Sequence, residues 1–151
     1  MADLTFKVSG TCETPTKTVA KARNFTMIID EPPALGGKNE GANPVEYLLA
    51  ALAGCLNVVG HLVAKEMNMD LRKMEIEIEG KLNPEKFAGK ETMDRAGFKE
   101  IKALIKVETD ADEETLKKWL ETVERRCPVS DNISNPTPVK ITFKKESSCC
   151  G

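Results

Sequence analysis

Two cysteines lie in settings where a thiol could act as a nucleophile. Cys55 is placed in the apolar run Leu-Ala-Ala-Leu-Ala-Gly-Cys-Leu-Asn-Val-Val-Gly, and Cys127 is placed in Arg-Arg-Cys-Pro-Val-Ser. The thiolate is the nucleophilic form of cysteine, and cationic neighbours or a helix N-terminus favour it. Cys127 has such a setting if a short helix begins at Pro128, whereas the alternative is a plain helix-to-loop junction with solvated arginines.

The helical pattern around Cys55 favours a structural interpretation of this residue. Cys55 shares one helical stripe with Leu48, Leu52 and Val59, so it faces packed apolar surroundings. An unpaired cysteine is among the most buried residue types and behaves as a small hydrophobic residue. Periodicity alone therefore indicates a core residue, and a reactive thiol is the alternative.

Other kinds of catalytic or metal site have few candidate residues. The chain has five cysteines, an odd number without Cys-x-x-Cys spacing, and one histidine, His61. His61 follows Cys55 by six positions, which rotates it by about 240° around a helix, so the two do not form an intrahelical dyad. We expect neither a metal site nor a bound cofactor.

The length, the net charge and the first residues of the chain limit the class of protein to which it can belong. The 151 residues, with a net charge of −2, suit one globular domain, which we place at residues 1–145 with a disordered tail at 146–151. A net charge this small and negative does not predict electrostatic binding to nucleic acid or to an anionic membrane surface. The N-terminus lacks the pattern of a secretory signal, so we expect a cytoplasmic protein that binds neither partner.

The elements that position the two cysteines follow from hydrophobic periodicity. A helix is predicted from Pro44 to about Met67, with Asn43 as N-cap and Glu46 completing a capping box, which by itself accounts for Glu46. An amphipathic helix is predicted from the N-cap Asp112 to near Cys127. The pattern indicates an α+β fold with the order β-β-β-α-β-β-α-(α)-β, and its predicted strands are 4–8, 18–23, 25–29, 74–79, 101–107 and 139–144.

The helix that carries Cys55 is apolar almost all the way round until Lys65. Such a helix is buried in a protein core or in a membrane. Asn57, His61 and many small residues favour the core. Because a chain this short that buries a whole helix needs a second copy to cover it, we expect a homodimer.

The motifs around the two cysteines resemble the OsmC/Ohr superfamily. The matching stretches are Asp-Glu-Pro-Pro-Ala-Leu-Gly-Gly-Lys-Asn-Glu-Gly-Ala-Asn-Pro-Val-Glu-Tyr-Leu-Leu-Ala-Ala-Leu-Ala-Gly-Cys-Leu-Asn and, about 70 residues later, Arg-Arg-Cys-Pro-Val-Ser-Asp-Asn-Ile. The resemblance covers about Phe25 to Phe143. It implies an intertwined homodimer with buried central helices and with active sites at the subunit interface.

The same resemblance implies thiol peroxidase activity on organic hydroperoxides. It assigns the attack on the peroxide to Cys55 and the resolving step to Cys127, and an external dithiol then restores the pair. The alternative function is a non-catalytic dimer of the same fold that binds an apolar ligand or senses oxidation.

The sequence departs from the hydroperoxide reductases of this superfamily at two positions. Val45 takes the place of the glutamate in their Asn-Pro-Glu motif, with Glu46 one place later, and the first hairpin offers Thr14–Lys17 where they have an arginine. Arg23 and Arg126 are the candidate activating cations, and Glu46 is a candidate supporting acid. These departures indicate a divergent OsmC-like branch, whose pattern gives no role to Cys12, Cys149 or Cys150.

Overall fold

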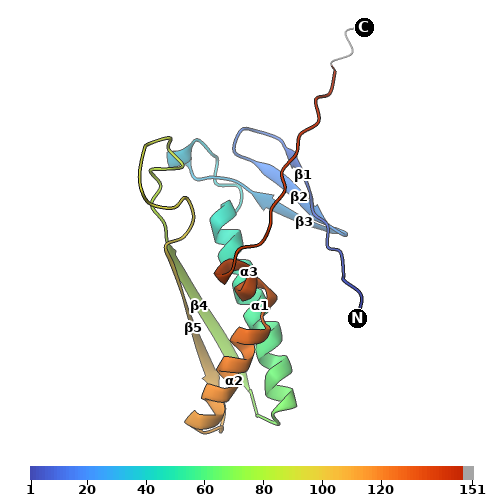
Figure 1. Ribbon diagram of the computed structural model, residues 1–151, viewed down its shortest axis with the longest axis vertical. Helices are drawn as coiled ribbons and strands as arrows, with labels where there is room; N and C mark the ends of the chain where they lie inside the picture. Colours follow the sequence, from blue (N-terminus) through green and yellow to red (C-terminus); the bar gives the residue numbers. More distant parts are fainter. Residues whose placement is uncertain (148–151) are drawn as a thin grey trace.

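The computed structural model describes residues 1–147 of the chain. It contains a three-stranded sheet, a two-stranded sheet, three α-helices and a short 3₁₀ helix (Figure 1). This mixed architecture confirms the predicted α+β class. The elements are β1 (Ser9–Cys12), β2 (Thr18–Ala22), β3 (Phe25–Ile29), η1 (Pro33–Leu35), α1 (Pro44–Glu66), β4 (Lys73–Lys81), β5 (Glu100–Glu108), α2 (Glu113–Arg126) and α3 (Pro128–Ser134).

Helix α1 begins at the predicted capping box. The Asn43 side chain accepts a hydrogen bond from the Glu46 backbone N–H at 2.9 Å, and the Glu46 carboxylate accepts one from the Asn43 N–H at 2.8 Å. These bonds satisfy two donors that a helix N-terminus otherwise leaves unpaired. The Tyr47 hydroxyl donates to the Ile28 carbonyl at 2.7 Å, which ties the first turn of α1 to β3.

The loop between β3 and α1 folds around one buried carboxylate. Asp30 is 1% exposed and accepts backbone N–H groups from Glu31, Lys38 and Glu40 at 2.8–3.1 Å. A β-carbon on Gly37 would lie 1.8 Å from the Glu31 carbonyl oxygen, so only glycine fits there. Asp30 therefore stabilises the loop that connects β3 to the start of α1.

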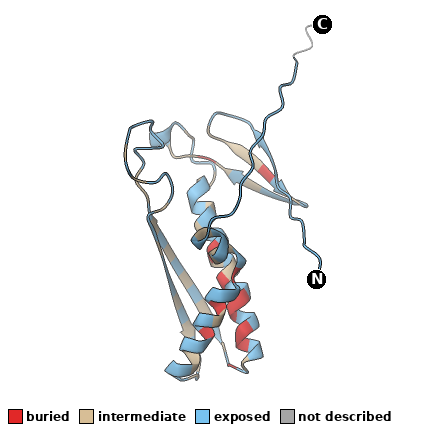
Figure 2. Cartoon of the chain, viewed as in Figure 1, coloured by how far each residue is buried: buried red, intermediate tan, exposed pale blue. Residues whose placement is uncertain are grey.

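The core forms where α1 faces α2 and the β4–β5 hairpin. Figure 2 shows the buried residues gathered on these facing surfaces. β4 alternates exposed and half-buried residues along its whole length, as its sequence predicts. The buried cluster consists of Leu52, Leu56, Val59, Val63, Ala64, Met69, Trp119, Val123 and Cys127.

In the single chain, only one face of the central helix is buried. Leu52, Val59 and Val63 of α1 are buried, but Val58 is 66% exposed and Leu62 is 47% exposed on the opposite side. The reason is that one chain supplies packing elements for only one face of α1. By length and composition α1 could also cross a membrane, but its contacts with α2, α3 and β4 make it the core helix of this fold.

Two predicted strands are also absent from the described chain. Residues 4–8 and 139–144 have no regular structure, and the first strand instead covers Ser9–Cys12. Both segments extend away from the body of the molecule (Figure 1). A strand needs a neighbour for its backbone hydrogen bonds, and the described chain offers none to either segment. Their alternating apolar side chains remain 66–95% exposed, namely Leu4, Phe6, Val8, Val139, Ile141 and Phe143.

Candidate functional site

The structure brings the thiols of Cys55 and Cys127 together. Their sulfur atoms lie 2.9 Å apart and share a hydrogen bond, although the residues are 72 positions apart in sequence. Cys55 comes from the middle of α1, and Cys127 stands between α2 and α3. A disulfide has a sulfur–sulfur distance of about 2.05 Å, so an approach of about 0.9 Å would allow a bond to form.

The two thiols differ in their accessibility. Cys127 is fully buried, whereas Cys55 is partly exposed. The Cys127 sulfur also caps α3, because it accepts the Ser130 backbone N–H at 3.4 Å. Cys127 therefore lies at the start of a short helix with Pro128 in its first turn, which is one of the two alternatives that its sequence context left open.

The surroundings of Cys55 disfavour its charged form. Burial raises the pKa of the Cys55 thiol, and the neighbouring Cys127 thiol raises this pKa further. The backbone N–H of Val129 acts in the opposite direction and lowers this pKa. Among residues 1–147, no cationic side chain contributes to this pKa.

Packing between α1 and α2 holds the two cysteines in register. The Trp119 indole N–H donates to the Gly60 carbonyl at 2.8 Å inside the core. A β-carbon on Gly60 would lie 3.1 Å from both Trp119 and Met74, so the missing side chain lets the indole lie against α1. Because Cys127 directly follows α2, this contact also fixes its distance from Cys55.

Arg126 lies next to Cys127 in sequence but points to another partner. Its guanidinium forms two hydrogen bonds with the Glu66 carboxylate, at 2.5 and 3.1 Å. Glu66 follows Cys55 by 11 residues, which is about 16 Å along a helix axis. This ion pair joins the ends of α1 and α2 and keeps the guanidinium away from the thiols.

Arg23 and Glu46 also lie apart from the thiol pair. Arg23 occupies the β2–β3 turn in a left-handed conformation, with φ of 56°, and its guanidinium lies 4.9 Å from the centre of the Phe25 ring. The Glu46 carboxylate is engaged in the capping box. In the described chain neither residue supports Cys55 directly.

The remaining candidates contribute no metal or histidine chemistry within residues 1–147. His61 is exposed, and its ring nitrogen Nδ1 hydrogen-bonds to the Asn57 carbonyl at 2.9 Å. The described residues contain no group of His, Cys, Asp and Glu suited to a metal ion. Cys12 is exposed on β1, and Cys149 and Cys150 lie outside the described residues.

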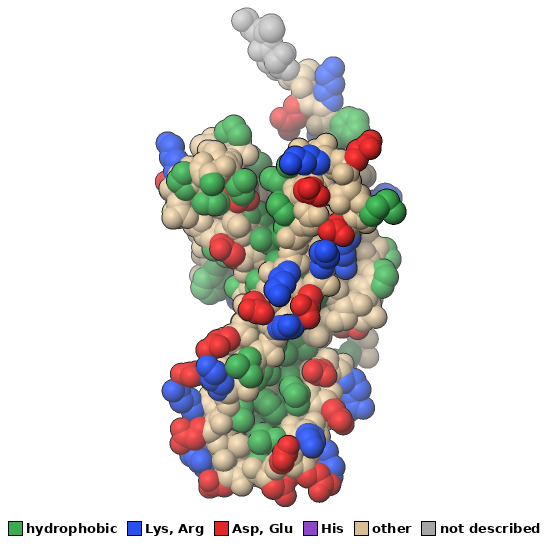
Figure 3. Space-filling view, turned by 90° about the vertical axis from the view of Figure 1, so that its left-hand side faces the viewer, with side chains coloured by type: hydrophobic (Ala, Val, Ile, Leu, Met, Phe, Trp, Pro, Cys, Tyr) green, Lys and Arg blue, Asp and Glu red, His purple; other side chains and the backbone are tan. Residues whose placement is uncertain are grey.

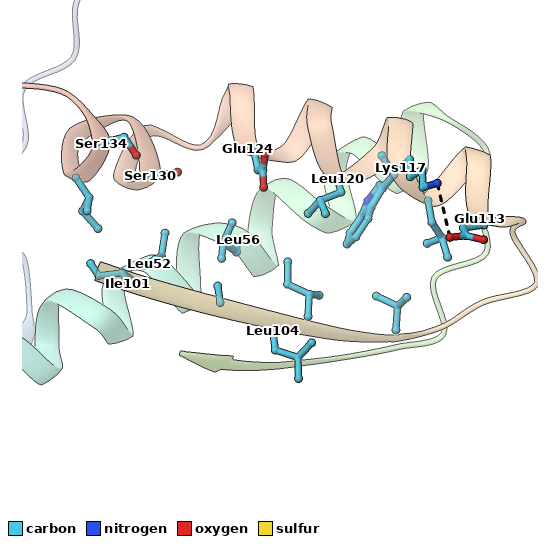
Figure 4. Close-up of a pocket in the computed structure, with 16 residues that line it drawn as sticks. Leu52, Leu56, Ile101, Leu104, Glu113, Lys117, Leu120, Glu124, Ser130 and Ser134 are labelled. Carbon is cyan, nitrogen blue, oxygen red and sulfur yellow. Dashed lines mark ion pairs between the residues drawn. The ribbon is translucent and has the colours of Figure 1, made fainter. Parts of the chain in front are cut away.

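Two grooves flank the helices that carry the thiols. The first, here named the α2–β5 groove, has a volume of about 510 Å³ and is mainly apolar. Figure 4 shows side chains from α1, α2 and β5 around it, and Figure 3 shows hydrophobic side chains exposed between charged ones on the half of the molecule built from these elements. Its apolar lining includes Leu52, Leu56, Ile101, Leu104, Leu116 and Leu120.

The second groove, here named the thiol-side groove, has a volume of about 770 Å³. Ala51 lies in its wall one helical turn before Cys55, and Val129, whose backbone N–H lowers the pKa of the Cys55 thiol, lies there as well. Neither cysteine itself lines either groove. Its lining includes Val45, Leu48, Ala51, Arg95, Phe98 and Val129.

Sequence reasoning did not identify Arg95 as part of this region. It lies in the 82–99 connection, far from both cysteines in sequence and without a recognisable motif. Only the folding of this connection over the first turns of α1 places it beside the groove. Val129 was missed for a related reason, because its contribution is a backbone N–H and its side chain gives no signal.

Several known proteins resemble this chain in sequence and in fold. A hydroperoxide reductase of Mycoplasma genitalium is 26% identical over 124 residues, which cover 82% of this chain and 83% of that protein. The structure of an OsmC-like protein from Mycoplasma pneumoniae has a TM-score of 0.76 at 19% identity and covers 88% of this chain and 89% of that one. The organic hydroperoxide resistance protein OhrB of Bacillus subtilis has a TM-score of 0.56 at 26% identity, with 85% and 89% covered.

The family comparison gives the strongest result. The model of the family described as OsmC-like protein matches residues 37–142, a range that includes α1, α2, α3 and both cysteines of the pair. The relatives named for hydroperoxide reduction and resistance support a peroxide-related redox role at low identity. The chain therefore belongs to the OsmC-like protein family.

Proposed function

We propose that this protein is a thiol-dependent peroxidase that reduces organic hydroperoxides through Cys55 and Cys127. The observation that carries the proposal is the 2.9 Å distance between the two sulfur atoms. A peroxide-reducing cysteine needs a nearby thiol, since its sulfenic acid is otherwise open to irreversible oxidation.

Accessibility supports the order of the two roles. The partly exposed Cys55 is the thiol that a peroxide can reach, and the buried Cys127 lies behind it. Cys55 thiolate attacks one peroxide oxygen, so that a sulfur–oxygen bond forms and the oxygen–oxygen bond breaks. The alkoxide leaves and takes up a proton to become the alcohol. Cys55 is oxidised to sulfenic acid, and the peroxide is reduced.

The second half of the cycle restores both thiols. The Cys127 thiol attacks the Cys55 sulfur, a disulfide forms, and the sulfenic oxygen leaves as water. An external dithiol then reduces this disulfide by two exchange steps and becomes a disulfide itself. The balance is one hydroperoxide and one dithiol consumed, and one alcohol, one water and one oxidised dithiol formed. No bound cofactor is needed.

The surroundings of Cys55 favour organic hydroperoxides over hydrogen peroxide. Leu52 and Leu56 flank it on α1, and both adjacent grooves have apolar walls. An alkyl group gains free energy by leaving water for such a surface, whereas hydrogen peroxide has no alkyl group.

A homodimer in the cytoplasm is part of the same proposal. The outer face of α1 and the two terminal segments expose alternating apolar residues that one chain leaves uncovered. Exposed apolar surface of this extent marks an interaction site, and a second copy would offer the same surface in return. A reducing compartment would also supply the external dithiol.

A second candidate function is a non-catalytic dimer that binds an apolar ligand or senses oxidation. The raised pKa of Cys55 and the lack of a contributing cation among residues 1–147 favour it, because both lower the thiolate fraction. In this case the cysteine pair would oxidise without sustained turnover.

One experiment separates the two functions. Reduced protein with Cys149 and Cys150 replaced by serine is treated with one equivalent of cumene hydroperoxide, and the products are mapped by mass spectrometry. A Cys55–Cys127 disulfide together with multiple turnovers in excess dithiol supports the peroxidase. A disulfide that forms once and never turns over, or an unreacted Cys55, contradicts the peroxidase and leaves the binding or sensing protein.

A further inference from the structure

The two sulfur atoms of the thiol pair differ in what surrounds them. Cys127 is 0% exposed and belongs to the buried cluster, whereas Cys55 is partly exposed and only packs against that cluster. Formation of the disulfide shortens their distance of 2.9 Å by about 0.9 Å. So small a movement leaves Cys127 inside the cluster. The disulfide therefore presents one sulfur to solvent and conceals the other.

Cys55 lies at the border between the two faces of α1. Leu52 and Val59, its neighbours on one side of the helix, are buried. Ala51 and Gly54, its neighbours on the other side, are exposed. Among residues 1–147, nothing lies within 4 Å of the position that a β-carbon on Gly54 would take. Open space therefore adjoins Cys55 on the side that faces away from the core.

The geometry of thiol–disulfide exchange turns this difference into a direction. A thiolate attacks one sulfur of the disulfide and displaces the other. The attacking, central and leaving sulfur atoms lie nearly in a line during this reaction. A reductant that attacks Cys55 can come from the open side of α1, opposite Cys127. A reductant that attacks Cys127 would have to stand inside the core, opposite Cys55.

The surroundings of the two sulfurs also favour one leaving group. The Ser130 backbone N–H donates a hydrogen bond to the Cys127 sulfur at 3.4 Å. A donor that already points at the atom on which negative charge develops lowers the barrier of the reaction. Departure of Cys55 is less favourable, because burial raises the pKa of its thiol and a thiol of higher pKa leaves more slowly.

We propose that the external dithiol attacks the Cys55 sulfur and that Cys127 leaves as a thiolate stabilised by the backbone N–H of Ser130. The proposal rests on the proposed function, which supplies the disulfide and the dithiol. A bond forms between the reductant sulfur and Cys55, the Cys55–Cys127 bond breaks, and Cys127 takes up the proton that the attacking thiol released. The second thiol of the reductant then attacks its own first sulfur, and Cys55 leaves and is protonated in turn.

Peptide mapping of the first exchange product tests the site of attack. The full chain carrying Cys12→Ser, Cys149→Ser and Cys150→Ser is oxidised with diamide and then treated briefly with 2-mercaptoethanol. After an acid quench, the free thiols are alkylated with N-ethylmaleimide and the adducts are mapped by mass spectrometry. Mercaptoethanol on Cys55 with N-ethylmaleimide on Cys127 should outnumber the opposite arrangement by about tenfold. An equal or reversed distribution overturns the proposal.

Ser130→Pro tests the role of the N–H in the departure of Cys127. Proline removes this donor and is tolerated in the first turn of a helix, whereas Ser130→Ala keeps the donor and is the matched control. Ser130→Pro should slow the attack of 2-mercaptoethanol on the disulfide by about tenfold, because a hydrogen bond to a charged group is lost. Ser130→Ala should leave this rate unchanged.

A second reaction separates this role from a structural one. When Cys127→Ser carries mercaptoethanol on Cys55, dithiothreitol attacks a mixed disulfide at the same place in the fold, but Cys127 is no longer the leaving group. Ser130→Pro should therefore leave the rate of this reaction unchanged. Equal slowing of both reactions, or slowing of neither, overturns the role of the Ser130 N–H.

The proposed function fails by a different measurement. Consumption of cumene hydroperoxide in excess dithiol tests the peroxidase, whereas diamide forms the disulfide without any peroxide. If the protein consumes no cumene hydroperoxide, the proposed function is wrong, and the mapped adducts still decide which sulfur a thiol attacks.

Discussion

Cys55 and Cys127 approach each other to 2.9 Å because α1 and the α2–α3 junction converge from distant parts of the sequence. The hydrogen bond from Trp119 to Gly60 joins α1 and α2, and the backbone N–H of Val129 lowers the pKa of the Cys55 thiol. The arrangement gives one accessible thiol and one buried thiol. Their different accessibility leads to different consequences when either is replaced.

Cys55→Ser and Cys127→Ser should fail in different ways. Cys55→Ser should abolish hydroperoxide consumption, because it removes the attacking sulfur. Cys127→Ser should allow one turnover and then leave Cys55 as sulfinic acid, because no thiol traps the sulfenic acid. Peroxide consumption and mass spectrometry of the Cys55 peptide measure both results. Retained multiple turnover in Cys127→Ser would contradict the resolving role, and Cys12→Ser serves as the control.

The reactivity of Cys55 should be shifted toward alkaline pH. Burial raises the pKa of its thiol above the ordinary value for cysteine, so the thiolate fraction at neutral pH is smaller than in an exposed cysteine. The rate of Cys55 alkylation by iodoacetamide should therefore still rise at pH values where N-acetylcysteine has levelled off. Peptide mapping over a pH series measures this rate. An inflection below that of N-acetylcysteine would show that a cation reaches the thiol after all.

Neither Arg126 nor Arg23 should be the cation that lowers the pKa of the Cys55 thiol. Arg126 is paired with Glu66, and Arg23 lies over Phe25 at the far turn of β2 and β3. Arg126→Met and Arg23→Met should each leave the pH profile of Cys55 alkylation within about twofold, because distant exposed charges are screened. A strong decrease in the rate of Cys55 alkylation in either variant would show that this arginine activates the thiol.

The sequence was informative wherever a local signal sufficed. The capping box of Asn43 and Glu46 predicted the start of α1, and Pro128 indicated the end of α2 near Cys127. The resemblance around the two cysteines pointed to their pairing, which helical periodicity alone did not. In each of these cases the residues that carry the signal are close together in the chain.

The remaining features depend on contacts that a sequence pattern does not specify. Residues 4–8 and 139–144 alternate like strands, but a strand forms only against a neighbour, and the described chain supplies none. Arg126 precedes Cys127 in sequence, but its side chain forms an ion pair with Glu66 at the end of α1. Arg95 lines the thiol-side groove only because the 82–99 connection folds over the first turns of α1.

Asp30 should stabilise the protein in a pH-dependent manner. Three backbone N–H groups, foremost that of Glu40, help to lower its pKa to about 2, so the native state holds the carboxylate charged while the unfolded chain protonates it near pH 3.9. Its contribution is therefore complete above about pH 4 and is lost as the pH falls toward 2.

Asp30→Asn tests this contribution through urea unfolding at several pH values. Its unfolding midpoint should be lower than that of the wild type at pH 7, and the difference should narrow below about pH 4. Asp3→Asn removes the same charge from the exposed N-terminal segment and should have little effect. A difference that stays constant down to pH 2 would mean that the ionised carboxylate is not the cause.

Two glycines of α1 should respond oppositely to the same substitution. A β-carbon on Gly60 would lie 3.1 Å from Trp119 and Met74, so Gly60→Ala should destabilise the fold by about 1–3 kcal/mol through overpacking. Nothing lies within 4 Å of the same position on Gly54, so Gly54→Ala should stabilise it by up to about 1 kcal/mol through helix propensity. Urea unfolding measures both changes in stability.

Because Trp119 also sets the distance from Cys127 to Cys55, Gly60→Ala should slow disulfide formation after peroxide treatment, whereas Gly54→Ala should not. Equal rates in the two variants would show that the α1–α2 contact does not position the thiol pair.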